Sequence, residues 1–276
     1  MLVAGAAGLW PLRSARAVQS PSTSPLAPLQ RGVALGLFHE DPLWSYAGLL
    51  KEIAQLGASH VALTVAYYQE HGGSTQIFSH PRFSPPDETV VRTIREAHAA
   101  GLQVMVFPIV RLLHPRSDSE WRGTLKPESL PAWWRSYEQT LLSLAALCQR
   151  SKVAVLSVGS ELSTLDTPPH HAQWQHLVAA VRKQYRGLLT YSGNWDHYQQ
   201  VGLYDLLDLA GMCAYFPLAS RLDVGPVPVE KMTAAWQKKR VELEQFAQDL
   251  KRPLLRTGGG SLNERGSAEW RGGEGG

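Results

Sequence analysis

Strand-like and helix-like segments alternate along this chain from Arg31 to Arg256, and this alternation limits the folds open to it. Apolar runs with strand character occupy residues 32–38, 60–67, 103–110, 153–158, 188–192, 207–214 and 253–256. Segments with helix character occupy residues 41–56, 87–100, 130–149, 172–185 and 229–250. Repeated strand–helix units are typical of a parallel sheet with right-handed crossovers. Seven strands in series, with no glycine-rich dinucleotide-binding turn after the first, predict an α/β fold of the (β/α)8 TIM-barrel type.

The segments on either side of this series differ in composition. Residues 1–30 contain a short apolar stretch, a sequence at 15–17 that resembles a leader-cleavage site, and a Pro- and Ser-rich linker. The basic residues that usually precede the apolar stretch of a leader peptide are missing. Residues 257–276 are Gly-rich and lack apolar periodicity, which predicts a disordered tail. We therefore expect one barrel domain over residues 31–256, and the leader-like start favours export without establishing it. Because only about seven strands are present, strands one and seven should be the edges of an open barrel.

Composition narrows the possible partners and cofactors. Basic and acidic residues number 27 and 24, and the basic ones are not clustered, so no nucleic-acid partner is expected. No apolar run in the sequence reaches the roughly 18 residues that can span a bilayer. Cys148 and Cys213 lie in apolar stretches and are expected to be buried. The histidine pair at 170–171 has no acidic ligand nearby in the sequence, so a metal site is not expected. We expect no other cofactor, and we expect the protein to be a monomer.

One carboxylate stands out at the end of a predicted buried strand. The apolar run 153–158 leads directly into Gly159, Ser160 and Glu161. Catalytic groups of α/β barrels lie at the C-terminal ends of the strands, so Glu161 is the candidate catalytic residue. Two structural interpretations remain open for it, because the side chain could cap the following loop or pair with Arg111.

Aromatic and hydrogen-bonding side chains follow the other predicted strands. Flat aromatic rings stack on the apolar faces of sugars, and amide, hydroxyl and guanidinium groups bind sugar hydroxyls, so the set predicts a carbohydrate cleft. Its candidate substrate-binding residues are Phe38, Tyr68, Arg111, His114, Trp121, Arg122, Ser160, Asn194, Trp195 and Tyr215. Large aromatics also close barrel ends, so Trp195 and Tyr215 have a packing alternative. The Trp121-Arg122 pair could be an ordinary turn with a cation–π contact, and His114 could be structural.

Several sequences in order resemble glycoside hydrolase family 113, the β-mannanase-like barrels of clan A. They are AHAAGLQVMVFP at 97–108, WRG at 121–123, AWWRSY at 132–137, VGSELS at 158–163, YSGNWD at 191–196 and AYFP at 214–217. The resemblance implies a retaining, endo-acting hydrolase of a mannan-like β-linked polysaccharide. It implies that Glu161 is the acid/base and that Tyr215 hydrogen-bonds a nucleophilic glutamate after strand seven. Ser160 stands where most of the clan has asparagine, which makes Asn194 a candidate contact to the sugar 2-OH.

The chain departs from this family pattern at the end of the seventh strand. The family has Thr-Glu there, whereas this chain has Thr257 and Gly258. Glu264, Glu269 and Glu274 follow no predicted strand, so we expect impaired hydrolysis for want of a nucleophile. Three explanations stay open: a truncated or frame-disrupted reading frame, a degenerate relative, or a non-catalytic carbohydrate-binding barrel. The loss of apolar pattern after residue 255 favours the first.

Overall fold

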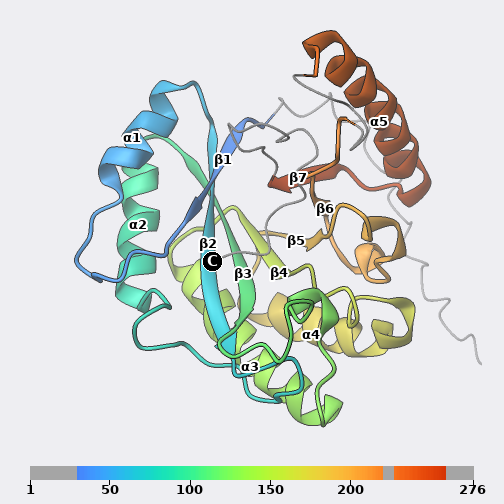
Figure 1. The fold of residues 1–276 in the computed structure, drawn as a ribbon. Helices are drawn as coiled ribbons and strands as arrows, with labels where there is room; N and C mark the ends of the chain where they lie inside the picture. The colour runs from blue at the N-terminus through green and yellow to red at the C-terminus, as the bar shows by residue number, and fades with distance from the viewer. Residues whose placement is uncertain (1–29, 220–226, 259–276) are drawn as a thin grey trace, which may run out of the picture.

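The computed structural model describes residues 30–219 and 227–258, and its centre is one sheet of seven parallel strands in sequence order (Figure 1). The strands are β1 Gly32–Gly36, β2 His60–Gln69, β3 Gln103–Leu112, β4 Val155–Ser160, β5 Leu188–Gly193, β6 Ala210–Cys213 and β7 Leu254–Gly258. Every neighbouring pair is parallel, which confirms the barrel-type α/β fold predicted from the sequence. The C-terminal ends of all seven strands therefore open on the same side of the sheet.

Within residues 30–219 and 227–258, five α-helices and four short 3-10 helices connect the strands. The α-helices are α1 Ala47–Gln55, α2 Asp87–Ala99, α3 Leu130–Arg150, α4 His171–Gln184 and α5 Val229–Leu250. The 3-10 helices are η1 Arg122–Thr124, η2 Pro168–His170, η3 Tyr198–Gln200 and η4 Tyr204–Leu206. In Figure 1, α1 and α2 lie side by side on the left of the sheet, and α5 stands at the upper right near β7.

One helix begins later than predicted, and the connection between β5 and β6, for which no helix was predicted, contains only short 3-10 helices. The helix expected from residue 41 begins only at Ala47, because the Asp41 carboxylate accepts the Leu43 N–H (2.8 Å) and forms a turn instead of a helix cap. Between β5 and β6, the chain forms η3 and η4 rather than an α-helix. Tyr204 anchors this connection by donating its hydroxyl hydrogen to the carbonyl of Gly211 on β6 (2.7 Å).

The last strand is longer than the sequence suggested. β7 continues through Thr257 and Gly258, which were expected to begin a disordered tail. The barrel domain thus includes both residues. The remaining predictions for the tail and for the N-terminal segment concern residues 259–276 and 1–29, which lie outside the described residues.

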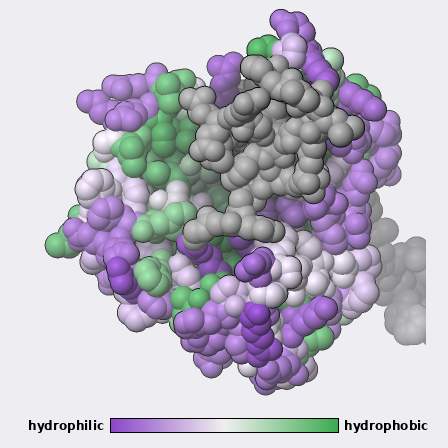
Figure 2. All heavy atoms as spheres, in the orientation of Figure 1, coloured by the Kyte–Doolittle hydropathy of each residue, from purple (hydrophilic) through white to green (hydrophobic). Residues whose placement is uncertain are grey.

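The two edge strands contrast with the middle of the sheet. β4 is buried at all six positions, whereas β1 is exposed over its first three residues. Val33 of β1 is 38% exposed. β1 and β7 come within 8 Å between Cα atoms, yet they are not hydrogen-bonded neighbours. Figure 2 shows hydrophobic side chains at the surface in the upper-left region, where Figure 1 places α1 and β1. The described strands therefore form an open barrel with the expected edges.

Aromatic side chains fill the layer between the sheet and helices α3 and α4. Trp133 stacks on Tyr137 with ring centroids 4.9 Å apart, and Trp174 meets Tyr191 of β5 edge-on at 5.5 Å. Tyr137 also donates to the carbonyl of Val158 in β4 (2.7 Å). This packing fixes the position of β4 just before its C-terminal end. None of the helices in the described ranges is both long and apolar enough to cross a membrane.

Candidate active site

Glu161 lies at the C-terminal end of β4, where the sequence predicted it. Its backbone N–H donates to the carbonyl of Ser192 on β5 (2.8 Å), and its side chain is 7% exposed. The residue has a φ of 53°, in the left-handed region. Such a conformation costs a non-glycine residue on the order of 1 kcal/mol and concentrates at functional sites. The turn after β4 therefore holds this carboxylate in a backbone conformation that local preference opposes.

A buried polar network supports the turn directly beneath Glu161. The Leu162 N–H donates to the hydroxyl of Tyr191 (2.7 Å), and that hydroxyl donates to Oδ2 of Asp166 (2.7 Å). Oδ1 of Asp166 pairs with Nε2 of His197 (2.9 Å). Burial raises the pKa of Asp166, and the contacts to Tyr191 and His197 only partly offset this. The network fixes the peptide next to Glu161 from three different parts of the chain.

Arg122 is the ion-pair partner of Glu161. Its Nη2 donates to Oε2 of Glu161, so the alternative partner considered from the sequence, Arg111, is not the one observed. The guanidinium also lies over the ring of Trp121, 5.4 Å from its centroid. Within the described residues, the buried Nε of Arg122 has no hydrogen-bond partner. This N–H is thus a donor that a ligand oxygen could satisfy.

The strands β6 and β7 meet Glu161 through a second polar group. Sγ of Cys213 lies 3.2 Å from Oγ of Ser192 and 3.8 Å from Oγ1 of Thr257, and the two hydroxyls contact each other. Burial, followed by the charge of Glu161, raises the pKa of the Cys213 thiol far above its usual value. Cys213 is buried, as expected, and a neutral thiol in this position cannot act as a nucleophile at ordinary pH.

Gly258 lies beside Tyr215 at the end of β7. A Cβ atom built at Gly258 would stand 3.5 Å from Oη of Tyr215 and 3.8 Å from its Cε2, which are ordinary contact distances. The backbone at Gly258 is outside the left-handed region, so an L side chain fits there. Burial, then Cys213 and Glu161, raise the pKa of Tyr215, while Arg122 opposes them. Position 258 therefore lies beside Tyr215, whose pKa is affected by the charges of Glu161 and Arg122.

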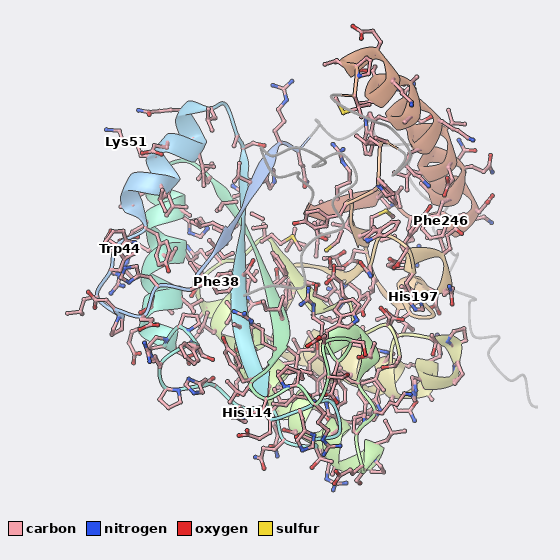
Figure 3. All side chains as sticks on the ribbon, in the orientation of Figure 1. Phe38, Trp44, Lys51, His114, His197 and Phe246 are labelled. Atoms are coloured by element: carbon pink, nitrogen blue, oxygen red, sulfur yellow. The ribbon has the colours of Figure 1, made fainter. Side chains whose placement is uncertain are left out.

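A second aromatic group surrounds Arg111 of β3. The Arg111 guanidinium lies 5.9 Å from the ring centroid of Phe38 and 6.0 Å from that of Tyr68. Phe38 is 47% exposed, whereas Tyr68 is buried. His114 stands apart in the view of Figure 3, where Phe38 and His114 are both labelled, and its Nδ1 pairs with Oε2 of Glu70 (3.0 Å).

The remaining predicted residues have partners within the protein. Trp195 packs edge-on against Phe216 with centroids 6.4 Å apart. Asn194 donates to Oδ1 of Asp196 (2.9 Å), and Ser160 is almost fully buried in β4. The structure thus brings together Trp121, Arg122 and Glu161, and likewise Phe38, Tyr68 and Arg111. Sequence reasoning missed the roles of Asp166, Tyr191, Ser192, His197 and Thr257; the hydroxyl residues inside apolar strands were the available signal.

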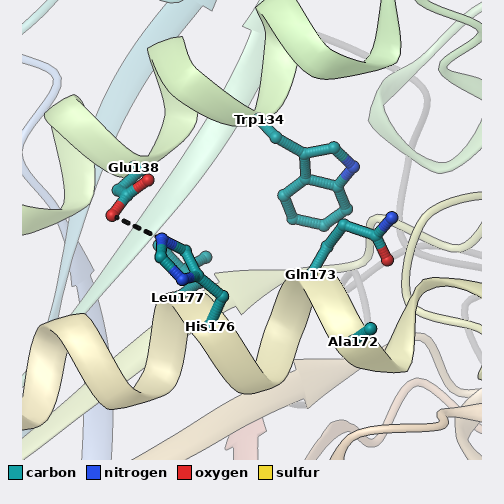
Figure 4. A pocket seen from close by; sticks show the side chains of 6 residues that line it. All are labelled: Trp134, Glu138, Ala172, Gln173, His176 and Leu177. Atoms are coloured by element: carbon teal, nitrogen blue, oxygen red, sulfur yellow. Dashed lines mark ion pairs between the residues drawn. The ribbon is translucent and has the colours of Figure 1, made fainter.

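A cavity elsewhere on the molecule is unrelated to this chemistry. It has a volume of about 270 Å³ and lies between α3 and α4, where Trp134, Gln173 and an ion pair of Glu138 with His176 line it (Figure 4). Glu138 Oε1 and His176 Nε2 are 3.3 Å apart. In the portion of the chain that the structure describes, no three His, Cys, Asp or Glu side chains group as metal ligands.

The fold and the site together define a class of protein: a parallel α/β barrel with a buried carboxylate and an aromatic, guanidinium-containing strand-end group. The chain belongs to glycoside hydrolase family 113, whose family model matches residues 45–271. A search of the curated proteins found no match.

Solved structures with the same architecture include enzymes of this family. The family-113 β-mannanase from Alicyclobacillus acidocaldarius, in complex with ManMIm, is 26% identical and has a TM-score of 0.74, with 88% of this chain and 75% of that chain covered. A family-113 β-1,4-mannanase in a complex is 20% identical, with a TM-score of 0.74 and coverage of 88% and 77%. A β-glucuronidase from Ruminococcus gnavus is 14% identical, with a TM-score of 0.54 and coverage of 87% and 38%. The last two likenesses show a shared fold.

Proposed function

We propose that this barrel binds a mannan-like, β-linked polysaccharide and that Glu161 is the proton-transferring carboxylate of a retaining site. The observation that carries the proposal is the position of Glu161, buried at the end of β4, paired with Arg122 and next to the phenol of Tyr215. Membership of family 113 and the likeness to a 26%-identical β-mannanase supply the substrate class. Phe38 and Trp121 would offer aromatic faces to the sugar rings.

A retaining glycosidase needs two carboxyl groups about 5–5.5 Å apart. One protonates the glycosidic oxygen as the bond breaks, and the other attacks the anomeric carbon from the opposite face. The first group then removes a proton from water, which hydrolyses the glycosyl-enzyme. In the proposal Glu161 has the proton-handling role, and Gly258 stands where the attacking carboxylate would be needed, beside Tyr215. We therefore propose that the chain as written hydrolyses its substrate poorly.

A non-catalytic carbohydrate-binding barrel is the second candidate function. The observation in its favour is the same Gly258, together with a Cys213 thiol whose raised pKa keeps it from replacing the carboxylate. The two candidates differ in one respect that can be measured. An impaired enzyme regains hydrolysis when a carboxylate is supplied at position 258, whereas a binding protein does not.

The test compares Gly258→Glu with the matched variant Gly258→Gln, which has the same shape but cannot form the glycosyl-enzyme. Reducing-sugar release from soluble β-1,4-mannan should be at least about 100-fold faster for Gly258→Glu than for Gly258→Gln and the parent. Binding to mannan should be similar in all three proteins. A folded Gly258→Glu variant that binds mannan without cleaving it would favour the binding protein. Rapid hydrolysis by the parent itself would refute the proposed impairment.

A further inference from the structure

We propose that the chain, as it stands, forms β-mannosidic bonds from an activated α-configured glycosyl donor, with Glu161 as the base that activates the acceptor. This inference rests on the proposed function, because it uses the same sugar site. It adds a second reaction, bond formation, for which one carboxylate is sufficient. Three features of the site support it, and each comes from a different strand end.

The first feature is the space at the end of β7. A carboxylate that attacks a β-glycoside approaches the anomeric carbon from its α face, opposite the departing oxygen. Position 258 lacks a side chain, and even an added Cβ would make only ordinary contacts, at 3.5 Å or more, with Tyr215. A donor with a small α-linked leaving group can therefore place that group where the carboxylate side chain would otherwise be.

The second feature is Tyr215 as a donor to the leaving group. Burial and the nearby Cys213 and Glu161 raise the pKa of Tyr215, so its phenol keeps its proton at neutral pH. A protonated hydroxyl next to position 258 can donate a hydrogen bond to an anion that leaves from the α face. Tyr215 follows β6 and Glu161 follows β4, so both residues lie at the C-terminal ends of the strands, where the leaving group and the base would meet.

The third feature is the way Glu161 is held. Arg122 donates to Oε2 of Glu161 and so holds the carboxylate that takes a proton from the acceptor in this inference. Hydrolysis would require Glu161 to act first as an acid and then as a base. Bond formation from an activated donor requires only the second role, for which a carboxylate held in place by a guanidinium is suited.

The reaction balances with a glycosyl fluoride as donor. The acceptor hydroxyl gives its proton to Glu161 while its oxygen attacks the anomeric carbon from the β face. The C–O bond forms as the C–F bond breaks, and fluoride leaves with the electron pair. Glu161 then releases its proton to water, so that donor and acceptor give a β-glycoside and hydrogen fluoride. Without a nucleophile at position 258, the β-linked product is not cleaved again.

The experiment uses the full chain, α-mannobiosyl fluoride as donor and 4-nitrophenyl β-mannoside as acceptor. Fluoride release should rise at least about 10-fold when acceptor is added, and the product should be β-linked by NMR. Glu161→Gln should lower this acceptor-dependent rate about 100-fold, as expected for loss of a general base. Tyr215→Phe should lower it about 10-fold or more through loss of one donor. Glu138→Gln, an equivalent change in the outer cavity, should match the parent.

The outcomes separate this inference from the proposed function. No β-linked product from the parent, or an undiminished rate in a folded Glu161→Gln variant, would overturn the inference. If Gly258→Glu then hydrolyses mannan in a Glu161-dependent way, the proposed function stands while the inference fails. Product formation by the parent that disappears in Gly258→Glu supports the inference, because the new side chain fills the space for the leaving group.

Discussion

The ends of β4 and β7 belong to one site but are built very differently. At β4, every strand residue is buried, and Glu161 is held by Ser192, by Arg122 and, through the next peptide, by Tyr191. At β7, the strand is only partly buried and ends in a glycine. The comparison indicates that the position of Glu161, the proposed proton-transferring group, is fixed from several sides, whereas the end of β7 offers space.

The surroundings of position 258 are nevertheless ordered. Thr257 is buried and contacts Ser192, and Tyr215 lies within contact distance of a side chain built on Gly258. Neighbouring strands, rather than the residue at 258 itself, thus determine the geometry there. This is why a single substitution at 258 can test the difference between the two strand ends.

The largest expected effect concerns Glu161 in the background of Gly258→Glu. Adding Glu161→Gln should lower kcat/KM for β-1,4-mannan by about 10²–10⁴, because the general acid/base is lost while shape is kept. Initial rates of reducing-end formation measure it. Equal rates in the single and double variants would mean that the β4 end is not the proton-transferring end.

Tyr191→Phe should be the next largest effect, this time on stability. It removes the hydroxyl that accepts the Leu162 N–H and donates to Asp166, and it leaves both buried groups without that partner. We expect a loss of about 2–3 kcal/mol in the free energy of unfolding, measured by urea denaturation. Tyr198→Phe is a matched control, since its hydroxyl bonds the more exposed Glu242. A loss no greater than that of the control would mean that the network does not hold the turn.

Asp166→Asn should change how stability depends on pH. Burial raises the pKa of Asp166 above 3.8 in the folded protein, so the folded state holds the proton more tightly than the unfolded state. The contribution of Asp166 to stability is therefore full below pH 3.8 and is lost as pH rises through the raised pKa. Asp166→Asn should remove this decline from unfolding curves recorded across that range. An unchanged pH dependence would contradict the assignment.

The smallest effect is expected far from both strand ends. Glu138→Gln breaks the exposed pair with His176 on the outer face of α3 and α4. The free energy of unfolding should change by less than about 0.5 kcal/mol, as for most surface substitutions, and mannan binding should be unaffected. Thermal unfolding and mannan-binding measurements on this variant serve as a baseline for the variants of the three preceding predictions. A large loss of binding would show that the outer cavity takes part in recognition.

Local patterns predicted the strands and the position of Glu161, because the end of a buried strand follows from apolar periodicity. Gly258 was noticed only through the resemblance to family 113, since the periodicity ended the seventh strand at residue 256. The partner of Glu161 was not predictable in this way. Arg111 lies near the end of β3 and Arg122 in the loop that follows, and only the path of this loop decides which of them reaches the carboxylate.

Other features depended on contacts between distant segments. Asp166 meets Tyr191 and His197 across 25 and 31 residues, and no local pattern encodes such a meeting. The start of α1 was mispredicted because Asp41 and Pro42 resemble a helix start, while the Asp41 side chain bonds Leu43 in a turn. Sequence reasoning thus predicted that Glu161 lies at a strand end, but not the buried contacts that hold the turn after it.

The left-handed backbone conformation of Glu161 lowers the stability of the folded protein in order to keep a carboxylate at this position. Glycine adopts a φ of 53° without steric penalty, and a buried ion pair such as Glu161–Arg122 is often no more stabilising than apolar residues of the same volume. A selection for thermal tolerance alone would therefore tend to replace both residues and discard the reactive group. Engineering of a hardier version of this barrel should keep positions 122 and 161 unchanged and seek its gains at exposed positions such as Val33.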